Sequence, residues 1–329
     1  MPPAFEKEIE LIEKSIEDFE EGKRGNVAVI SDPFYGESDL MKRAGEIIGS
    51  SGLKVDARSL IHDFEVLEKA SEKIVMVDEA HRLYRRKIGG FEAINRFLSF
   101  IPSSDGLFIT TWNSYSWKYL DEVLGLGRHF PQKIRLSKMG AGQIQEMLLS
   151  GYEEGELTFV EEVPVDAEEL KILSRSSYQK TLMGRSIEIP YPVVDIRSIR
   201  SRRTKSEKKS SEEIFFDKLA RISDGNPGVA EYLWNEALDY PEVRNALKDP
   251  PSIDLDYDES FAIGIVLSMG SIQVRELSDV LEPLDLSAEK IAGLLEERGL
   301  VFSEGDVIAI RSEALKSVVE HLRRLRLVW

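Results

Sequence analysis

The stretch NVAVISDPFYGES, residues 26–38, decides the fold. Residues 26–30 are mostly apolar, as a buried parallel strand requires, and residues 39–48 have helical spacing. Residues 31–38 between them contain Asp, Pro, Gly and Ser, which favour a loop. A strand, a short loop and a helix in this order form the framework of a phosphate-binding loop, because backbone N–H groups at a helix start can face an anion.

Strand and helix patterns alternate around this loop up to about residue 137. Such alternation implies a parallel sheet with helices on its faces. We therefore expect an α/β domain of the P-loop type over residues 1–137. Its further strands are expected at 54–59, 73–79, 106–111 and 133–136, and its helices at 5–19 and 91–100.

The loop departs from the phosphate-loop consensus G-x-x-x-x-G-K-[ST] at two places. The second glycine and the hydroxyl are present as Gly36 and Ser38, but Ser31 replaces the first glycine and Glu37 replaces the lysine. The lysine normally neutralises the β- and γ-phosphates. A carboxylate at that position repels them, so the loop is predicted to bind nucleotide weakly or not at all.

If ATP or ADP with Mg²⁺ does bind, its contacts should come from the loop and the start of the following helix. The ion is then expected on Ser38 and Asp78. An unorthodox active site is the alternative, in which Lys42 or Arg43 of the helix reaches back to the phosphates. The candidate nucleotide contacts are Asp32, Pro33, Gly36, Glu37, Ser38 and Asp39.

A second acidic motif follows the apolar run 74–77, which ends in Asp78 and Glu79 as a Walker B segment does. In a working site Asp78 would hold Mg²⁺ through water and Glu79 would polarise the attacking water. The alternative is a buried strand whose end is acidic without a catalytic role.

Two further candidates follow later strands. Asn113 is either a polar group facing the γ-phosphate or a turn residue, for which asparagine is favoured. Arg128 is either an arginine finger toward a neighbouring subunit or a solvated loop arginine. The four histidines show no metal-ligand spacing.

Beyond residue 137 the pattern becomes mostly helical, and we expect a helical lid domain over 138–250 and a winged-helix domain over 251–329. The basic run 197–209 carries seven Lys and Arg against one Glu, which is typical of a solvated loop or a nucleic-acid patch. Helices are expected at 140–149, 167–174, 212–222, 228–238, 259–268, 274–281 and 287–298, a linker at 241–251 and a hairpin at 300–310.

In this order, segments 31–38, 74–79, 110–113, 224–230 and 252–329 resemble an AAA+ ATPase of the archaeal initiator and STAND-like group. The resemblance implies a P-loop domain, a helical lid and a winged helix, with ATP and Mg²⁺ as ligands. Two departures stand out. The Walker A lysine is replaced by Glu37, and the lid helix begins Gly228-Val-Ala-Glu231 without the arginine with which initiator-type relatives sense the γ-phosphate.

These departures predict a pseudo-ATPase that acts as a scaffold or regulator, with no cofactor expected. An active ATP hydrolase and a DNA-binding initiator-type protein remain the alternatives. Whether the chain is an enzyme at all is left open by its sequence.

The composition of the chain limits the kinds of partner that we expect for it. The net charge is −16, and the sequence has no cysteine. It also has no run of 18 apolar residues, which is the length that would indicate a membrane span. We therefore expect a cytoplasmic protein without a membrane partner. Residues 252–329 hold 8 Lys and Arg against 15 Asp and Glu, so a protein partner is favoured for the winged helix. Any nucleic acid is expected at Arg197–Lys209, and an oligomer is possible.

Overall fold

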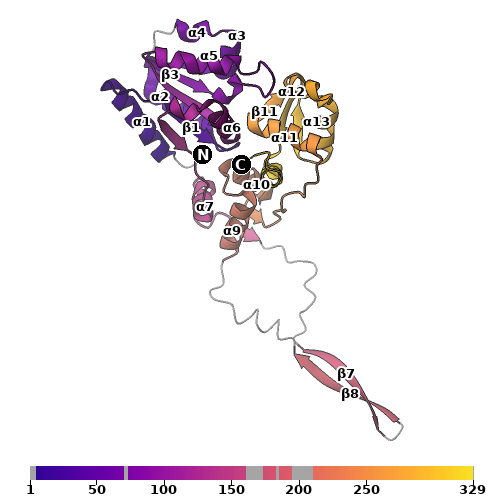
Figure 1. Ribbon diagram of the computed structural model, residues 1–329. Helices are drawn as coiled ribbons and strands as arrows, with labels where there is room; N and C mark the ends of the chain where they lie inside the picture. Colours follow the sequence, from indigo (N-terminus) through magenta and orange to yellow (C-terminus); the bar gives the residue numbers. More distant parts are fainter. Residues whose placement is uncertain (1–4, 70–72, 161–172, 183–184, 195–209, 329) are drawn as a thin grey trace.

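The computed structural model describes residues 5–69, 73–160, 173–182, 185–194 and 210–328. A sheet domain, a helical module and a C-terminal module lie against one another (Figure 1). The basic run 197–209 lies outside the described residues, as do residues 167–172 of the expected helix 167–174. The helix prediction is wrong at its C-terminal end, because a strand begins at Leu173. No helix of the described parts is long and apolar enough to cross a membrane.

The predicted parallel α/β sheet is confirmed. Five strands lie in the order β2-β3-β4-β1-β5, and every neighbouring pair is parallel. The strand expected at 54–59 begins and ends earlier, because the side chain of Asp56 accepts a hydrogen bond from the Arg58 N–H and starts a helix. The strands are β1 (Val27–Ser31), β2 (Gly52–Asp56), β3 (Ile74–Asp78), β4 (Leu107–Asn113) and β5 (Gln132–Arg135).

Helices cover both faces of this sheet. Alternate residues of β1 point to opposite faces: Val27 and Val29 pack with α1 and α2, whereas Ala28 and Ile30 pack with the helices of the other face. This is why the strand reads as a continuous apolar run. The helices are α1 (Glu6–Glu20), α2 (Glu37–Ile48), α3 (Ala57–His62), α4 (Glu65–Glu68), α5 (Glu92–Phe100) and α6 (Ser114–Leu124).

The helical module is formed by α7, α9 and α10 with a small sheet in the order β6-β10-β9. The expected linker 241–251 is therefore partly wrong, because Val243 is fully buried and β10 pairs with both neighbours. The elements are α7 (Ala141–Leu149), α9 (Ser211–Ser223), α10 (Pro227–Ala237), β6 (Thr158–Val160), β9 (Leu238–Asp239), β10 (Glu242–Arg244) and the separate antiparallel pair β7 (Leu173–Leu182) and β8 (Arg185–Val194).

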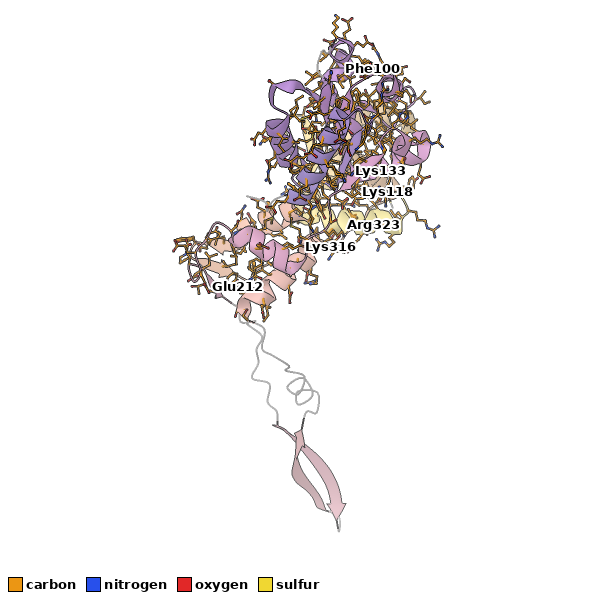
Figure 2. The ribbon with its side chains drawn as sticks, turned by 90° about the vertical axis from the view of Figure 1, so that its left-hand side faces the viewer. Phe100, Lys118, Lys133, Glu212, Lys316 and Arg323 are labelled. Carbon is orange, nitrogen blue, oxygen red and sulfur yellow. The ribbon has the colours of Figure 1, made fainter. Side chains whose placement is uncertain are left out.

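The C-terminal module contains the three helices and the hairpin expected from the sequence, plus a short strand that was not predicted. Its three-stranded antiparallel sheet has the order β11-β13-β12. Lys316 donates to the carbonyl of Arg221 at 2.6 Å and joins this module to α9 (Figure 2). The elements are α11 (Tyr257–Met269), β11 (Ser271–Gln273), α12 (Val274–Leu281), α13 (Ala288–Glu297), β12 (Val301–Glu304), β13 (Val307–Ile310) and α14 (Leu315–Arg324).

Candidate functional site

The loop between β1 and α2 leaves the carboxyl edge of the sheet from its central region, with β4 as the neighbour of β1. Two residues turn the chain through the left-handed region, Phe34 with φ of 67° and Gly36 with φ of 77°. The helix starts at Glu37, two residues earlier than expected. The geometry therefore keeps a strand, loop and helix start in the place of a phosphate loop.

The side chain of Glu37 is turned back into this loop. The residue is half-buried, and its carboxyl lies near its own backbone N–H and the Ser31 side chain. Burial of the carboxyl, with the nearby charges of Glu79 and Asp78, raises the pKa of Glu37 to about 7, against the lowering effect of the backbone N–H and Ser31. A phosphate at a helix start takes the same kind of backbone N–H groups. The Glu37 carboxyl thus lies close to a donor that a bound phosphate requires.

The remaining loop candidates are placed differently. Ser38 and Asp39 are exposed on the first turn of α2, and Asp32 accepts a hydrogen bond from the Ser114 hydroxyl. Lys42 is exposed and lies 3.5 Å from the Asp39 carboxylate, so it is directed to solvent and to its own helix. Arg43 is exposed as well. These positions do not support the alternative in which Lys42 or Arg43 reaches back to the phosphates.

The loop is docked on the start of α10. The Asn226 amide donates to the Pro33 carbonyl at 2.7 Å, and the Gly228 N–H donates to the Phe34 carbonyl at 3.0 Å. A Cβ atom on Gly228 would lie 2.3 Å from the Phe34 oxygen. No side chain fits there, so an arginine at the position of Gly228 would have to displace the loop.

Replacing Gly228 by alanine is expected to lower the free energy of unfolding by about 1–3 kcal/mol, the usual range for overpacking a close contact. The matched control is Gly293→Ala in α13, where a Cβ would meet nothing within 4 Å. That control should be neutral or stabilising by up to about 1 kcal/mol. Chemical denaturation of both variants measures the difference, and equal stability would contradict a tight loop contact.

Asp78 and Glu79 both lie at the carboxyl end of β3, but each has a protein partner. The Thr111 hydroxyl donates to Asp78 at 2.7 Å. The guanidinium of Arg82 donates to both Glu79 oxygens, at 2.6 and 2.9 Å. Burial alone would raise the pKa of Glu79, but the bonds and charge of Arg82 outweigh it and lower that pKa. Glu79 is therefore held as an ion pair with Arg82.

Arg82 was not identified from the sequence, although it follows Glu79 by three residues. Its side chain is only 7% exposed. Besides Glu79, it donates to the carbonyl of Ser271 at 2.8 Å and to the Ser271 hydroxyl at 3.0 Å. The Walker B-like glutamate is thus connected through one arginine to β11 of the C-terminal module.

Asn113 is buried, and both of its side-chain polar atoms are used within the protein. Its oxygen caps α6 by accepting from the N–H groups of Tyr115 and Ser116, at 2.9 and 3.4 Å. Its amide donates to the Leu267 carbonyl at 2.9 Å. This favours a structural role over a phosphate-facing one. Arg128 is exposed in a short helical turn after α6, as a solvated loop arginine would be.

His81 also belongs to this edge and was not identified as a site residue. Its Nδ1 accepts from the Asn113 N–H at 3.2 Å, and its Nε2 lies 3.4 Å from the Met269 carbonyl. Burial lowers the pKa of His81 to about 4, with the charges of Arg82 and Arg58 acting in the same direction and that of Glu79 against it. The ring is therefore neutral near pH 7.

The titration of His81 predicts acid sensitivity. Its folded pKa is about 4 against 6.5 unfolded, so the unfolded state binds more protons between these values. Stability from this group is complete above about pH 6.5 and falls toward pH 4, by about 2 kcal/mol from about pH 7 to about pH 5. Urea unfolding of wild type and His81→Gln at both pH values measures it. An identical pH dependence in the two proteins would contradict the assignment.

A groove of about 460 Å³ lies beside this edge, between residues 60–64 at the end of α3 and residues 82–96. Four cations line it, but each already has a carboxylate partner on the protein: Arg82 with Glu79, Arg85 with Glu276, Lys87 with Asp279 and Arg96 with Glu68. Within the described residues, no group of three His, Asp or Glu side chains is placed to hold a metal ion.

Fold and site together define a parallel α/β protein with a loop in the phosphate-loop position. No family model and no curated protein sequence matches the chain. The RuvB Holliday junction branch migration motor of Thermotoga maritima is similar at 11% identity, with 97% of this chain and 94% of that chain covered and a TM-score of 0.43. The ORC1 protein of Aeropyrum pernix in complex with DNA is similar at 12% identity, with 100% and 95% covered and a TM-score of 0.39. Likeness at this level carries no argument about what the chain does.

Proposed function

We propose that this chain is an AAA+-like P-loop protein that works as a scaffold or regulator and does not hydrolyse ATP. The observation that carries the proposal is the Glu37 carboxyl, which lies near the N–H at the start of α2, at the position where the phosphate-loop consensus has a lysine. Repulsion between this carboxylate and a phosphate disfavours nucleotide at the loop.

The other residues of the edge do not fit Mg-ATP either. Phe34 is hydrogen-bonded to Gly228, at the start of the helix that lacks the phosphate-sensing arginine of the resembled family. Glu79 is paired with Arg82, and Asn113 caps a helix. Three positions that serve a nucleotide in the resembled family therefore serve contacts within this protein, and we derive no hydrolytic step from them.

The C-terminal module supports the partner side of the proposal. Its order of helix, strand, helix, helix, strand and strand supports the winged helix proposed for residues 251–329. The third helix, α13, exposes Glu289 and Glu297, and the hairpin turn exposes Glu304 and Asp306. DNA affinity depends mainly on phosphate contacts, so an acidic face of this kind fits a protein partner. The proposed domains keep the limits 1–137, 138–250 and 251–329.

Steady-state hydrolysis of Mg-ATP tests the proposal. The purified chain is expected to show no turnover above that of Glu79→Gln, because both lack a free general base. Turnover that is present in wild type and disappears in Glu79→Gln would show an active site and contradict the proposal.

A further inference from the structure

The end of α11 is capped by another part of the molecule. A helix leaves its last carbonyl groups without partners inside the helix. Here three consecutive carbonyls meet side chains of the sheet domain: Leu267 with Asn113 at 2.9 Å, Ser268 with the Ser116 hydroxyl at 2.6 Å and Met269 with His81 at 3.4 Å. The three donors come from the carboxyl ends of β3 and β4 and from the start of α6.

Arg82 completes this contact and adds charge to it. Its guanidinium binds Ser271 just beyond the helix and Glu79 on the sheet side. A cation near a helix C-terminus is stabilised by the partial negative charge there. Farther out, Arg85 and Lys87 pair with Glu276 and Asp279 of α12, which widens the contact.

We infer that the carboxyl edge of the sheet is the docking site for the C-terminus of α11, and that this contact holds the C-terminal module without nucleotide. The edge at which P-loop proteins bind phosphate is used here to bind peptide carbonyl groups. Arg82 is the positioning residue, because among the described residues of this edge its side chain alone bonds both Glu79 and Ser271. Breaking the bonds of Arg82 to Ser271 and breaking its bonds to Glu79 are therefore coupled.

The absence of cysteine allows a direct distance measurement on the full chain. Glu46 on α2 and Glu289 on α13 are exposed and belong to different modules, so spin labels on Glu46→Cys and Glu289→Cys report their separation. The otherwise unchanged protein should give one narrow distance distribution. Adding Glu79→Gln with Arg82→Met, which removes the pair without leaving a lone charge, should add a longer-distance population. Arg96→Gln removes a surface pair with Glu68 and a cation–π contact with the Phe64 ring, both within the sheet domain, so it is the matched control and should change nothing.

Ser116→Ala with Ser271→Ala is the second variant, for the case in which circular dichroism shows the first to be unfolded. It removes two hydrogen bonds of the contact with little change in volume and should also add a longer-distance population. A folded variant that keeps the narrow distribution overturns the inference, as does a broad distribution in the unmutated background. Movement of the unmutated labels on addition of Mg-ATP would contradict docking without nucleotide, whereas turnover alone would contradict only the proposed function.

Discussion

Replacing Glu37 by lysine is expected to raise the affinity for Mg-ATP by at least about tenfold. The change removes the carboxyl that lies near the backbone N–H at the start of α2 and supplies the missing cation. Two unit charges about 4 Å apart interact by about 4 kcal/mol near a protein surface. Reversing the charge therefore exceeds the roughly 1.4 kcal/mol that a tenfold change in affinity requires, even when desolvation cancels much of it.

The matched control is Glu46→Lys, which makes the same charge change at an exposed position of the same helix. Calorimetric titration with Mg-ATP should show a gain for Glu37→Lys and none for the control. Equal gains would mean that only the net charge matters. If Glu37→Lys gives no gain in affinity, the contact between Phe34 and Gly228, and not Glu37, keeps nucleotide from the loop.

Replacing Arg82 by alanine is expected to lower the free energy of unfolding by about 3 kcal/mol, the lower end of the range for breaking a buried ion pair. The substitution leaves the carboxylate of Glu79, which is 35% exposed, without its cation and removes both bonds to Ser271. The surface pair of Arg96 with Glu68 is more exposed on both sides, so Arg96→Ala should cost less than about 1 kcal/mol.

Glu79→Gln added to Arg82→Ala should recover part of the loss, because the unpaired charge is removed. Urea denaturation of the single and double variants measures this coupling. If Arg82→Ala and Arg96→Ala cost the same, the contact through Arg82 does not contribute to holding the module.

The sheet and its loop could be predicted because their signals are local. The apolar runs of β1, β3 and β4 identify buried parallel strands, and the loop 31–38 fixes the place of the helix start. Glu37 could be singled out for the same reason, because one consensus position holds the wrong charge. The ion pair of Glu79 with Arg82 also had a local signal, since the two residues are three positions apart.

The contacts at the edge could not be predicted, because they join residues far apart in the chain. His81 and Met269 are separated by 188 positions, and Asn113 and Leu267 by 154. Their bonds go to backbone carbonyls, which carry no residue-specific pattern. The strand β11 escaped prediction because it has three residues with one buried side chain, Ile272. In the sequence, Gly228 was noted only because the helix that it begins lacks a phosphate-sensing arginine. Its close contact with Phe34 explains why glycine is required at this position.

Calorimetric titration of the unmodified chain with Mg-ATP at about pH 8 tests the central claim most directly. At that pH most of the Glu37 carboxyl, with its pKa of about 7, is ionised and repels phosphate. We expect no saturable heat up to about 1 mM nucleotide, the concentration that corresponds to about −4 kcal/mol of binding. A one-to-one isotherm with a dissociation constant in the micromolar range would contradict it.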